Sequence, residues 1–267
     1  MGFTYAGNLG GAGAPVVRRF QISEDCYVGQ LVQTGLVAGT GGHIQIADVA
    51  TEASDDDQTI IGFISAIADD SRTYVASSSG TAEYGNKSTY TTTQATVAAN
   101  LGTKLTGGGE VDVTLALPMQ TLIRAPIYNA AWGTALTTLT ATSASSGGTV
   151  VADTANAITD IADDYATVYC RTGANRGQYR IITTSTSTTS QTVTVPFPYG
   201  IAIGDTFVVA SCVLGKGGLD FPATADCIDG NNDMDAFYDV YYHDINLEES
   251  GKEYAVFALT NWYHTHA

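Results

Sequence analysis

A two-residue alternation of apolar and polar positions recurs along most of this chain and is clearest in its third quarter. From Tyr165 to Cys170, Tyr and Thr positions alternate with smaller apolar residues, which is typical of a half-buried strand. Thr172–Gly177 then supplies a Gly/Asn turn, and β-branched residues resume at Gln178–Thr184. Pro196 and Pro198 lack the amide donor that a strand ladder needs, so pairing is predicted to stop before them.

Further strands are expected where short extended runs lie between Gly, Pro or Asn turns. The ranges that meet this description are Val16–Ile22, Tyr27–Thr34, His43–Asp48, Thr59–Ile67, Glu110–Leu117, Thr192–Val195, Thr206–Ala210 and Lys252–Trp262. The Ser/Thr run Ser185–Ser190 has no apolar anchor and is predicted to be an exposed loop. Only Thr92–Leu101, which contains Ala and Gln but no Gly or Pro, favours a short helix as an alternative.

The fold class predicted from these strands is all-β. Two small antiparallel β-barrel or sandwich modules are expected, a first β domain at residues 16–130 and a second at residues 131–267. An extended N-terminal arm at residues 1–15 is expected to precede them, because this segment is rich in Gly and Ala and carries no regular alternation.

The expected arm holds two isolated aromatic residues, Phe3 and Tyr5, and a pair of arginines follows it at Arg18 and Arg19. One interpretation is a disordered terminus. The other is an arm that becomes ordered on a partner, with Phe3 and Tyr5 as anchors and the two arginines as a positively charged contact at its base. These four residues are the candidate binding residues.

Composition narrows the classes of partner. Hydrophobic residues make up 44% of the chain, enough for a substantial core, while charged residues make up only 14%. The net charge of −16 repels phosphate backbones, so nucleic acid is not an expected partner. No stretch approaches the roughly 18 apolar residues of a membrane span, and the opening residues do not form a secretory signal. We therefore expect synthesis in the cytoplasm and no membrane partner.

The cysteines and the metal-ligand residue types do not form a recognised motif. Four cysteines without CxxC spacing predict free thiols rather than disulfides or a zinc site: Cys26, Cys170, Cys212 and Cys227. The acidic segment 226–235 resembles the first half of a calcium loop, but Met234 and Val240 occupy positions where that loop needs Gly and Glu. A surface turn is favoured there, with calcium left open, and His264 and His266 are interpreted as an exposed tail. No metal and no cofactor are predicted.

Recognised enzymatic motifs do not occur in the chain. The chain contains neither GxSxG nor the phosphate-binding GxxxxGK[ST], and its Gly-rich segments do not match GxGxxG at a helix start. No catalytic residue is predicted, and the chain is expected not to be an enzyme. A glycosidase with two carboxylates stays open as an alternative, because spacing along a β chain does not reveal such a pair.

Two segments resemble proteins of phage virions. Residues 16–67 resemble the opening of tailed-phage capsid decoration (head-stabilising, or cement) proteins, through Tyr27-Val28-Gly29-Gln30-Leu31-Val32 and, after a variable loop, Ile60-Ile61-Gly62-Phe63-Ile64. Separately, TGANRGQYRIIT followed by TVTVPFP and GDTFVV resembles small β modules common in virion proteins. The two segments together cover less than half of the chain.

The resemblance implies a non-enzymatic structural protein on the outer surface of the virion. Its expected partner is the major capsid protein, bound through the N-terminal arm, and its expected state is a homotrimer that gains avidity from several attachment points. Two alternatives come from other classes. One is a tail or fibre component that binds host-surface carbohydrate through the Tyr-rich range 237–242 and Trp262, and the other is a polysaccharide hydrolase.

Overall fold

The computed structural model describes residues 2–22, 24–34, 43–47, 59–67, 72–76, 82–86, 90–91, 104–105, 109–130, 133–156, 158, 166–187, 189–222, 224–230 and 238–260. Within these residues every regular element is a β-strand, so the all-β prediction is confirmed. Thr, Val, Ile and Tyr suit the pleated surface of a sheet, and Gly and Asn supply its turns. The alternative helix at Thr92–Leu101 lies outside the described residues.

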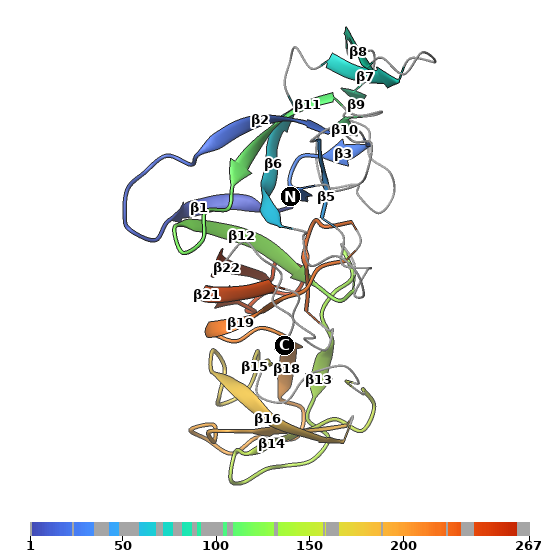
Figure 1. Ribbon diagram of the computed structural model, residues 1–267. Coiled ribbons are helices and arrows are strands. Elements are labelled where there is room, and N and C mark those ends of the chain that lie inside the picture. Colours follow the sequence, from blue (N-terminus) through green and yellow to red (C-terminus); the bar gives the residue numbers. More distant parts are fainter. Residues whose placement is uncertain are drawn as a thin grey trace.

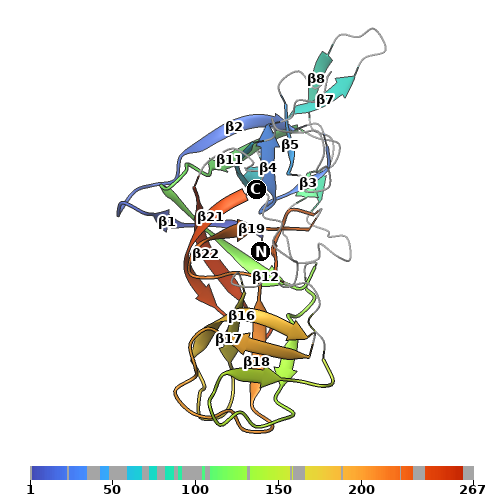
Figure 2. The same cartoon turned by 60° about the horizontal axis from the view of Figure 1, so that its bottom comes forward.

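The strands gather into three bodies stacked along the long axis of the molecule, and two views show the same order (Figure 1, Figure 2). The middle body is a central sheet in the order β1-β12-β22-β21-β19, and the short β20 pairs in parallel with β12. Its strands are β1 (Thr4–Asn8), β12 (Thr121–Tyr128), β19 (Gly215–Leu219), β20 (Ile228–Asp229), β21 (Tyr238–Asn246) and β22 (Tyr254–Leu259).

One end of the molecule is a closed barrel in the order β11-β2-β5-β4-β6, with β6 pairing back to β11. Its strands are β2 (Val17–Ile22), β4 (Leu31–Thr34), β5 (Ile44–Ile46), β6 (Ile60–Ile67) and β11 (Gly109–Leu115). At the same end lie a small sheet and a hairpin that extends beyond the barrel (Figure 1). The small sheet contains β3 (Cys26–Tyr27), β9 (Tyr90–Thr91) and β10 (Lys104–Leu105), and the hairpin contains β7 (Arg72–Ala76) and β8 (Ala82–Asn86).

The opposite end is a curled sheet in the order β13-β18-β15-β16-β17-β14. The two edge strands of this sheet, β13 and β14, lie close to each other: just beyond β13, the Thr142 amide donates to the Ala152 carbonyl of β14 at 2.8 Å. The sheet therefore bends almost into a second barrel. Its strands are β13 (Thr138–Thr140), β14 (Val150–Ala152), β15 (Thr167–Cys170), β16 (Tyr179–Ser187), β17 (Ser190–Val193) and β18 (Thr206–Ala210).

Chain order explains how the three bodies hold together. The barrel is inserted between β1 and β12, and the curled sheet is inserted between β12 and β19. The expected division at residue 130 therefore runs through the central sheet, which takes strands from both predicted domains. One apolar core joins the central sheet to both ends, since Phe63 of the barrel and Val208 of the curled sheet belong to the same cluster as Phe257.

The segment that resembles decoration proteins contains two positions, Gly29 and Gly62, where the backbone conformation or close packing favours glycine. A Cβ at Gly62 in β6 would overlap the backbone oxygen of Thr114 in β11, so only glycine lets these strands approach so closely. Gly29 has φ +95 and lies against Gly2. Next to it, buried Gln30 accepts from the Tyr27 amide at 2.6 Å through its side-chain oxygen.

The N-terminal arm is where the structure corrects the prediction. Residues 4–8 form β1, which pairs antiparallel with β12 inside the central sheet, with Thr4 opposite Arg124. The segment is therefore part of the folded body rather than an extended arm. The physical reason is that its backbone groups find partners on β12 and its aromatic side chains find a core, neither of which a local pattern can reveal.

Candidate functional site

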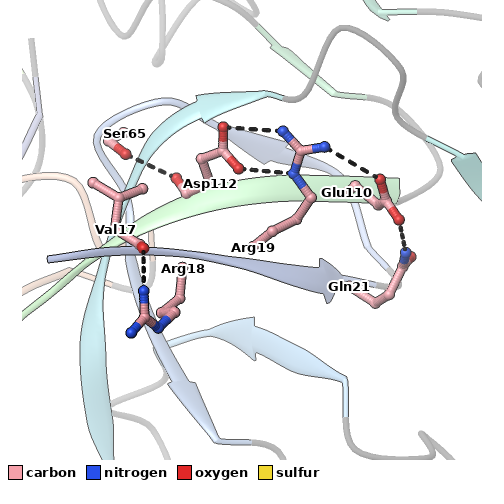
Figure 3. A network of polar contacts seen from close by, with 7 residues as sticks. All are labelled: Val17, Arg18, Arg19, Gln21, Ser65, Glu110 and Asp112. Atoms are coloured by element: carbon pink, nitrogen blue, oxygen red, sulfur yellow. Dashed lines mark hydrogen bonds and ion pairs between the residues drawn. The ribbon is translucent and has the colours of Figure 1, made fainter.

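The predicted arginine pair lies on strand β2 of the barrel, and both residues are exposed (Figure 3). Successive residues of a strand point to opposite faces, so Arg18 and Arg19 leave the strand in opposite directions. Arg19 stands directly opposite Asp112 of β11 in the ladder, and both side chains project from the outer face. Residues paired across an antiparallel ladder share one face, so the opposite charges of Arg19 and Asp112 lie side by side.

Arg19 is held by two carboxylates of β11. Its Nε donates to Asp112 Oδ1 at 2.9 Å, and its guanidinium lies 3.9 Å from Glu110 Oε2. Gln21, two residues along the same face, donates to Glu110 at 2.8 Å, and Ser65 Oγ donates to the Asp112 carbonyl at 2.9 Å. The Arg19 side chain is 47% exposed, so we expect this network to contribute no more than about 1 kcal/mol. Its chemistry is that of a structural surface cluster.

Arg18 offers a different surface. Its guanidinium donates to the carbonyl of neighbouring Val17 at 3.3 Å, and the residue is exposed. The loop that precedes β2 is exposed over residues 9–14 and extends beyond the sheet edge (Figure 1). Arg18, Arg19 and this loop are thus the parts of the predicted binding region that lie at the surface.

The other two predicted binding residues face inward. Phe3 is 1% exposed and meets Phe257 of β22 edge to face, with ring centroids 6.3 Å apart, while its amide donates to Gly29 at 2.7 Å. Tyr5 is half-buried against the same core, and its hydroxyl donates to the Gly13 carbonyl at 2.7 Å. The structure therefore does not bring Phe3 and Tyr5 together with the arginine pair on one binding surface.

The acidic segment 226–235 is described up to residue 230, and its carboxylates there act within the fold. Asp226 is buried and accepts from Thr224 Oγ1 at 2.7 Å, and burial raises the pKa of its carboxyl. Asp229 accepts from the Ala130 amide at 2.9 Å. Within the described ranges no cluster of three or more His, Cys, Asp or Glu side chains could hold a metal. Residues 231–237 lie outside those ranges.

The cysteines are free, as predicted, and all four are buried. Burial raises the pKa of Cys170 to about 11 and that of Cys212 to about 12, so their thiols stay protonated at neutral pH. Burial, followed by the charge of Asp226, also raises the pKa of Cys227. These thiols behave as small apolar side chains rather than nucleophiles.

The Tyr-rich strand β21 divides its aromatic residues between two faces. Tyr242 is buried, and its hydroxyl donates to the Gly218 carbonyl at 2.7 Å. Tyr241 faces outward, 40% exposed, and its ring lies 4.9 Å from that of His243. Trp262, His264 and His266 lie outside the described residues.

Two features of the structure were missed in the sequence. One is the buried ion pair Arg171–Glu253, which ties the curled sheet to the central sheet. The other is the loop between β17 and β18, which leaves Val195, Tyr199 and Ile203 exposed. The sequence does show apolar residues around Pro196 and Pro198. It does not show whether an apolar residue in a loop will be buried or exposed.

In comparisons with known proteins, no family model, curated protein or solved structure matches the chain. A search of the described residues for a helix long and apolar enough to cross a membrane also finds none.

Proposed function

We propose that this chain is a structural protein of a tailed-phage virion that decorates the outer surface of the capsid, binds the major capsid protein and stabilises the shell without catalysis. One observation carries the proposal. The segment that resembles decoration proteins, residues 16–67, supplies four strands of the closed barrel, β2, β4, β5 and β6. Most of the resembling residues that the structure describes thus belong to one barrel, with Tyr27 in the adjoining small sheet, and among them Gly29 and Gly62 occupy positions that packing restricts.

Attachment is proposed for the outer surfaces of the body. Phe3 lies in the core and is excluded as an anchor, whereas Arg18 and the exposed loop at residues 9–14 remain accessible. A rigid body that attaches through side chains already ordered loses less conformational entropy than an arm that must fold on its partner. A homotrimer would multiply such contacts and supply avidity. The net charge of −16 is compatible with a position outside the shell, away from packaged DNA.

Binding to shells tests this proposal. The purified full-length chain is mixed with empty shells assembled from the major capsid protein of the same virion, and the mixture is sedimented. We expect the chain to sediment with the shells and to raise the temperature at which they disassemble. Failure to bind shells at micromolar concentration would contradict the proposal, and binding without any gain in shell stability would contradict its stabilising role.

A specific observation favours one alternative, a tail or fibre component that binds carbohydrate. The outer face of the central sheet carries Tyr241 beside His243, and on the same face Arg124 lies 3.8 Å over the Tyr254 ring. An exposed aromatic ring on the face of a sheet is suited to stacking against a sugar, and Tyr241 is such a ring. A glycan array probed with the intact chain and with Tyr241→Ala distinguishes this function, because decoration predicts no glycan signal that depends on Tyr241.

A further inference from the structure

The most exposed apolar side chains in the described part of the chain gather on one short loop. The loop joins β17 to β18 at residues 194–205 and belongs to the curled sheet, at the opposite end of the molecule from the barrel (Figure 1). Val195, Tyr199 and Ile203 are 58%, 63% and 69% exposed, the highest values among the large hydrophobic residues described. Single exposed apolar residues are ordinary, but three on one short loop indicate a contact surface.

The 194–205 loop is fixed from beneath. Asn175, which is fully buried, donates to the Tyr199 carbonyl at 2.9 Å and accepts from the Tyr199 amide at 3.0 Å. Ser145 and Ile201 exchange two backbone hydrogen bonds, at 3.0 and 2.9 Å. The Asp205 carboxylate accepts from the Ala202 amide at 2.9 Å. The loop therefore presents its side chains in one conformation and loses little entropy when it binds.

Buried and exposed positions along the loop are sorted regularly. Phe197 and Ile201 are buried, and the Phe197 ring packs 5.7 Å from that of Phe207 in the core of the curled sheet. Tyr199 lies between these two buried residues along the chain, and Val195 and Ile203 lie on either side of them. Because the buried residues already anchor the loop, the exposed ones are not needed to hold the fold, and their exposure requires another explanation.

Two arginines of the described part of the curled sheet lie beside the loop. Arg176 is exposed and follows Asn175 directly, and Arg180 donates to the Pro196 carbonyl at 3.1 Å with its guanidinium 5.1 Å from the Phe197 ring centroid. The carboxylates of the curled sheet that the structure describes, Asp153 and Asp205, are buried. On a chain of net charge −16, the described part of this end presents arginines and apolar groups.

We infer that the 194–205 loop, together with Arg176 and Arg180, is a docking surface for an acidic protein surface, which, given the function proposed above, belongs to the major capsid protein. Tyr and Arg are the residues that most often dominate protein interfaces. Val195 and Ile203 are aliphatic, so they suit an apolar protein surface better than a sugar, which stacks on aromatic rings. A symmetric pair of these loops would bring Arg176 and Arg180 against their own copies, which disfavours a two-fold dimer through this surface.

The experiment measures binding of full-length variants to empty shells of the major capsid protein by sedimentation. The double variant Tyr199→Ser/Ile203→Ser removes two exposed side chains that support no described core contact, and Arg176→Glu reverses the charge beside them. Met119→Ser, at a position 43% exposed between β11 and β12, is the matched control. We expect both loop variants to melt like wild type and to bind shells at least about tenfold more weakly, with the control unchanged. Added salt should weaken wild type more than Arg176→Glu.

The outcomes separate the docking inference from the function on which it rests. Wild type that does not bind shells contradicts the proposed function and the inference with it. Loop variants that bind as tightly as wild type overturn the inference and leave the function standing. Concentration-dependent self-association that the double variant abolishes would assign the loop to a second copy of the chain. Glycan binding that the double variant abolishes would assign it to a carbohydrate. Either result overturns the inference.

Discussion

Replacing Phe3 with Ala tests whether the N-terminal segment belongs to the folded body. Phe3 is 1% exposed and lies in the core shared by the barrel, the central sheet and the curled sheet, against Phe257. Truncation of a fully buried Phe removes its transfer free energy and leaves a cavity, which together cost about 3–5 kcal/mol. For a chain of this size each kcal/mol lowers the melting temperature by roughly 2–4 °C, so Phe3→Ala should lower it by about 10 °C.

The assay is urea unfolding of the purified full-length chain, followed by circular dichroism and checked by a thermal melt. Phe3→Leu keeps most of the apolar volume and should recover most of the lost free energy of unfolding. Leu9→Ala, at a position 39% exposed just beyond β1, is the matched control and should stay within about 0.5 kcal/mol of wild type.

An extended arm gives a different result. In that case Phe3 is solvated in the unbound protein, and its truncation changes the free energy of unfolding by no more than about 0.5 kcal/mol. A Phe3→Ala variant as stable as wild type would therefore refute the placement of β1 in the central sheet.

Three further substitutions test other contacts. Gly62→Ala forces a Cβ into the backbone of β11 and should cost about 3 kcal/mol in urea unfolding, whereas Gly10→Ala, with open space around it, should change little. Arg171→Met leaves the Glu253 carboxylate buried without its ion-pair partner and should cost about 3 kcal/mol, most of which the added Glu253→Gln should restore. Burial raises the Asp226 pKa, so the ionised carboxyl destabilises the fold above that pKa, and its protonation relieves this cost as pH falls. Asp226→Asn should therefore raise the melting temperature at neutral pH, by an amount that shrinks on acidification; a gain independent of pH would contradict this account.

Local pattern was sufficient for much of the fold. The range Val16–Ile22 was predicted and β2 covers Val17–Ile22; Glu110–Leu117 was predicted and β11 covers Gly109–Leu115. These strands were predictable because one face is buried and the other solvated, so apolar and polar residues alternate along the sequence. The loop predicted at Ser185–Ser190 was wrong in part, since β16 continues to Ser187 and β17 begins at Ser190. Ser and Thr there pair through their backbones and need no apolar anchor.

Long-range pairing was not predictable. β1 was interpreted as an arm because its partner strand, β12, lies more than a hundred residues away, with Thr4 opposite Arg124. The same limit applied to the candidate binding residues. The exposure of Arg18 and Arg19 follows from their charge, but the burial of Phe3 depends on which distant strands meet it. The exposed 194–205 loop was missed because sequence does not show which apolar residues stay uncovered.

The stoichiometry of this chain in purified virions tests the central claim most directly. Intact particles are separated from free protein, and the ratio of this chain to the major capsid protein is measured by quantitative mass spectrometry. Decoration of the shell predicts a copy number comparable to that of the major capsid protein, with release of the chain before the shell itself comes apart. A handful of copies per particle would instead assign the chain to a tail or portal, and its absence from purified particles would contradict a role in the virion.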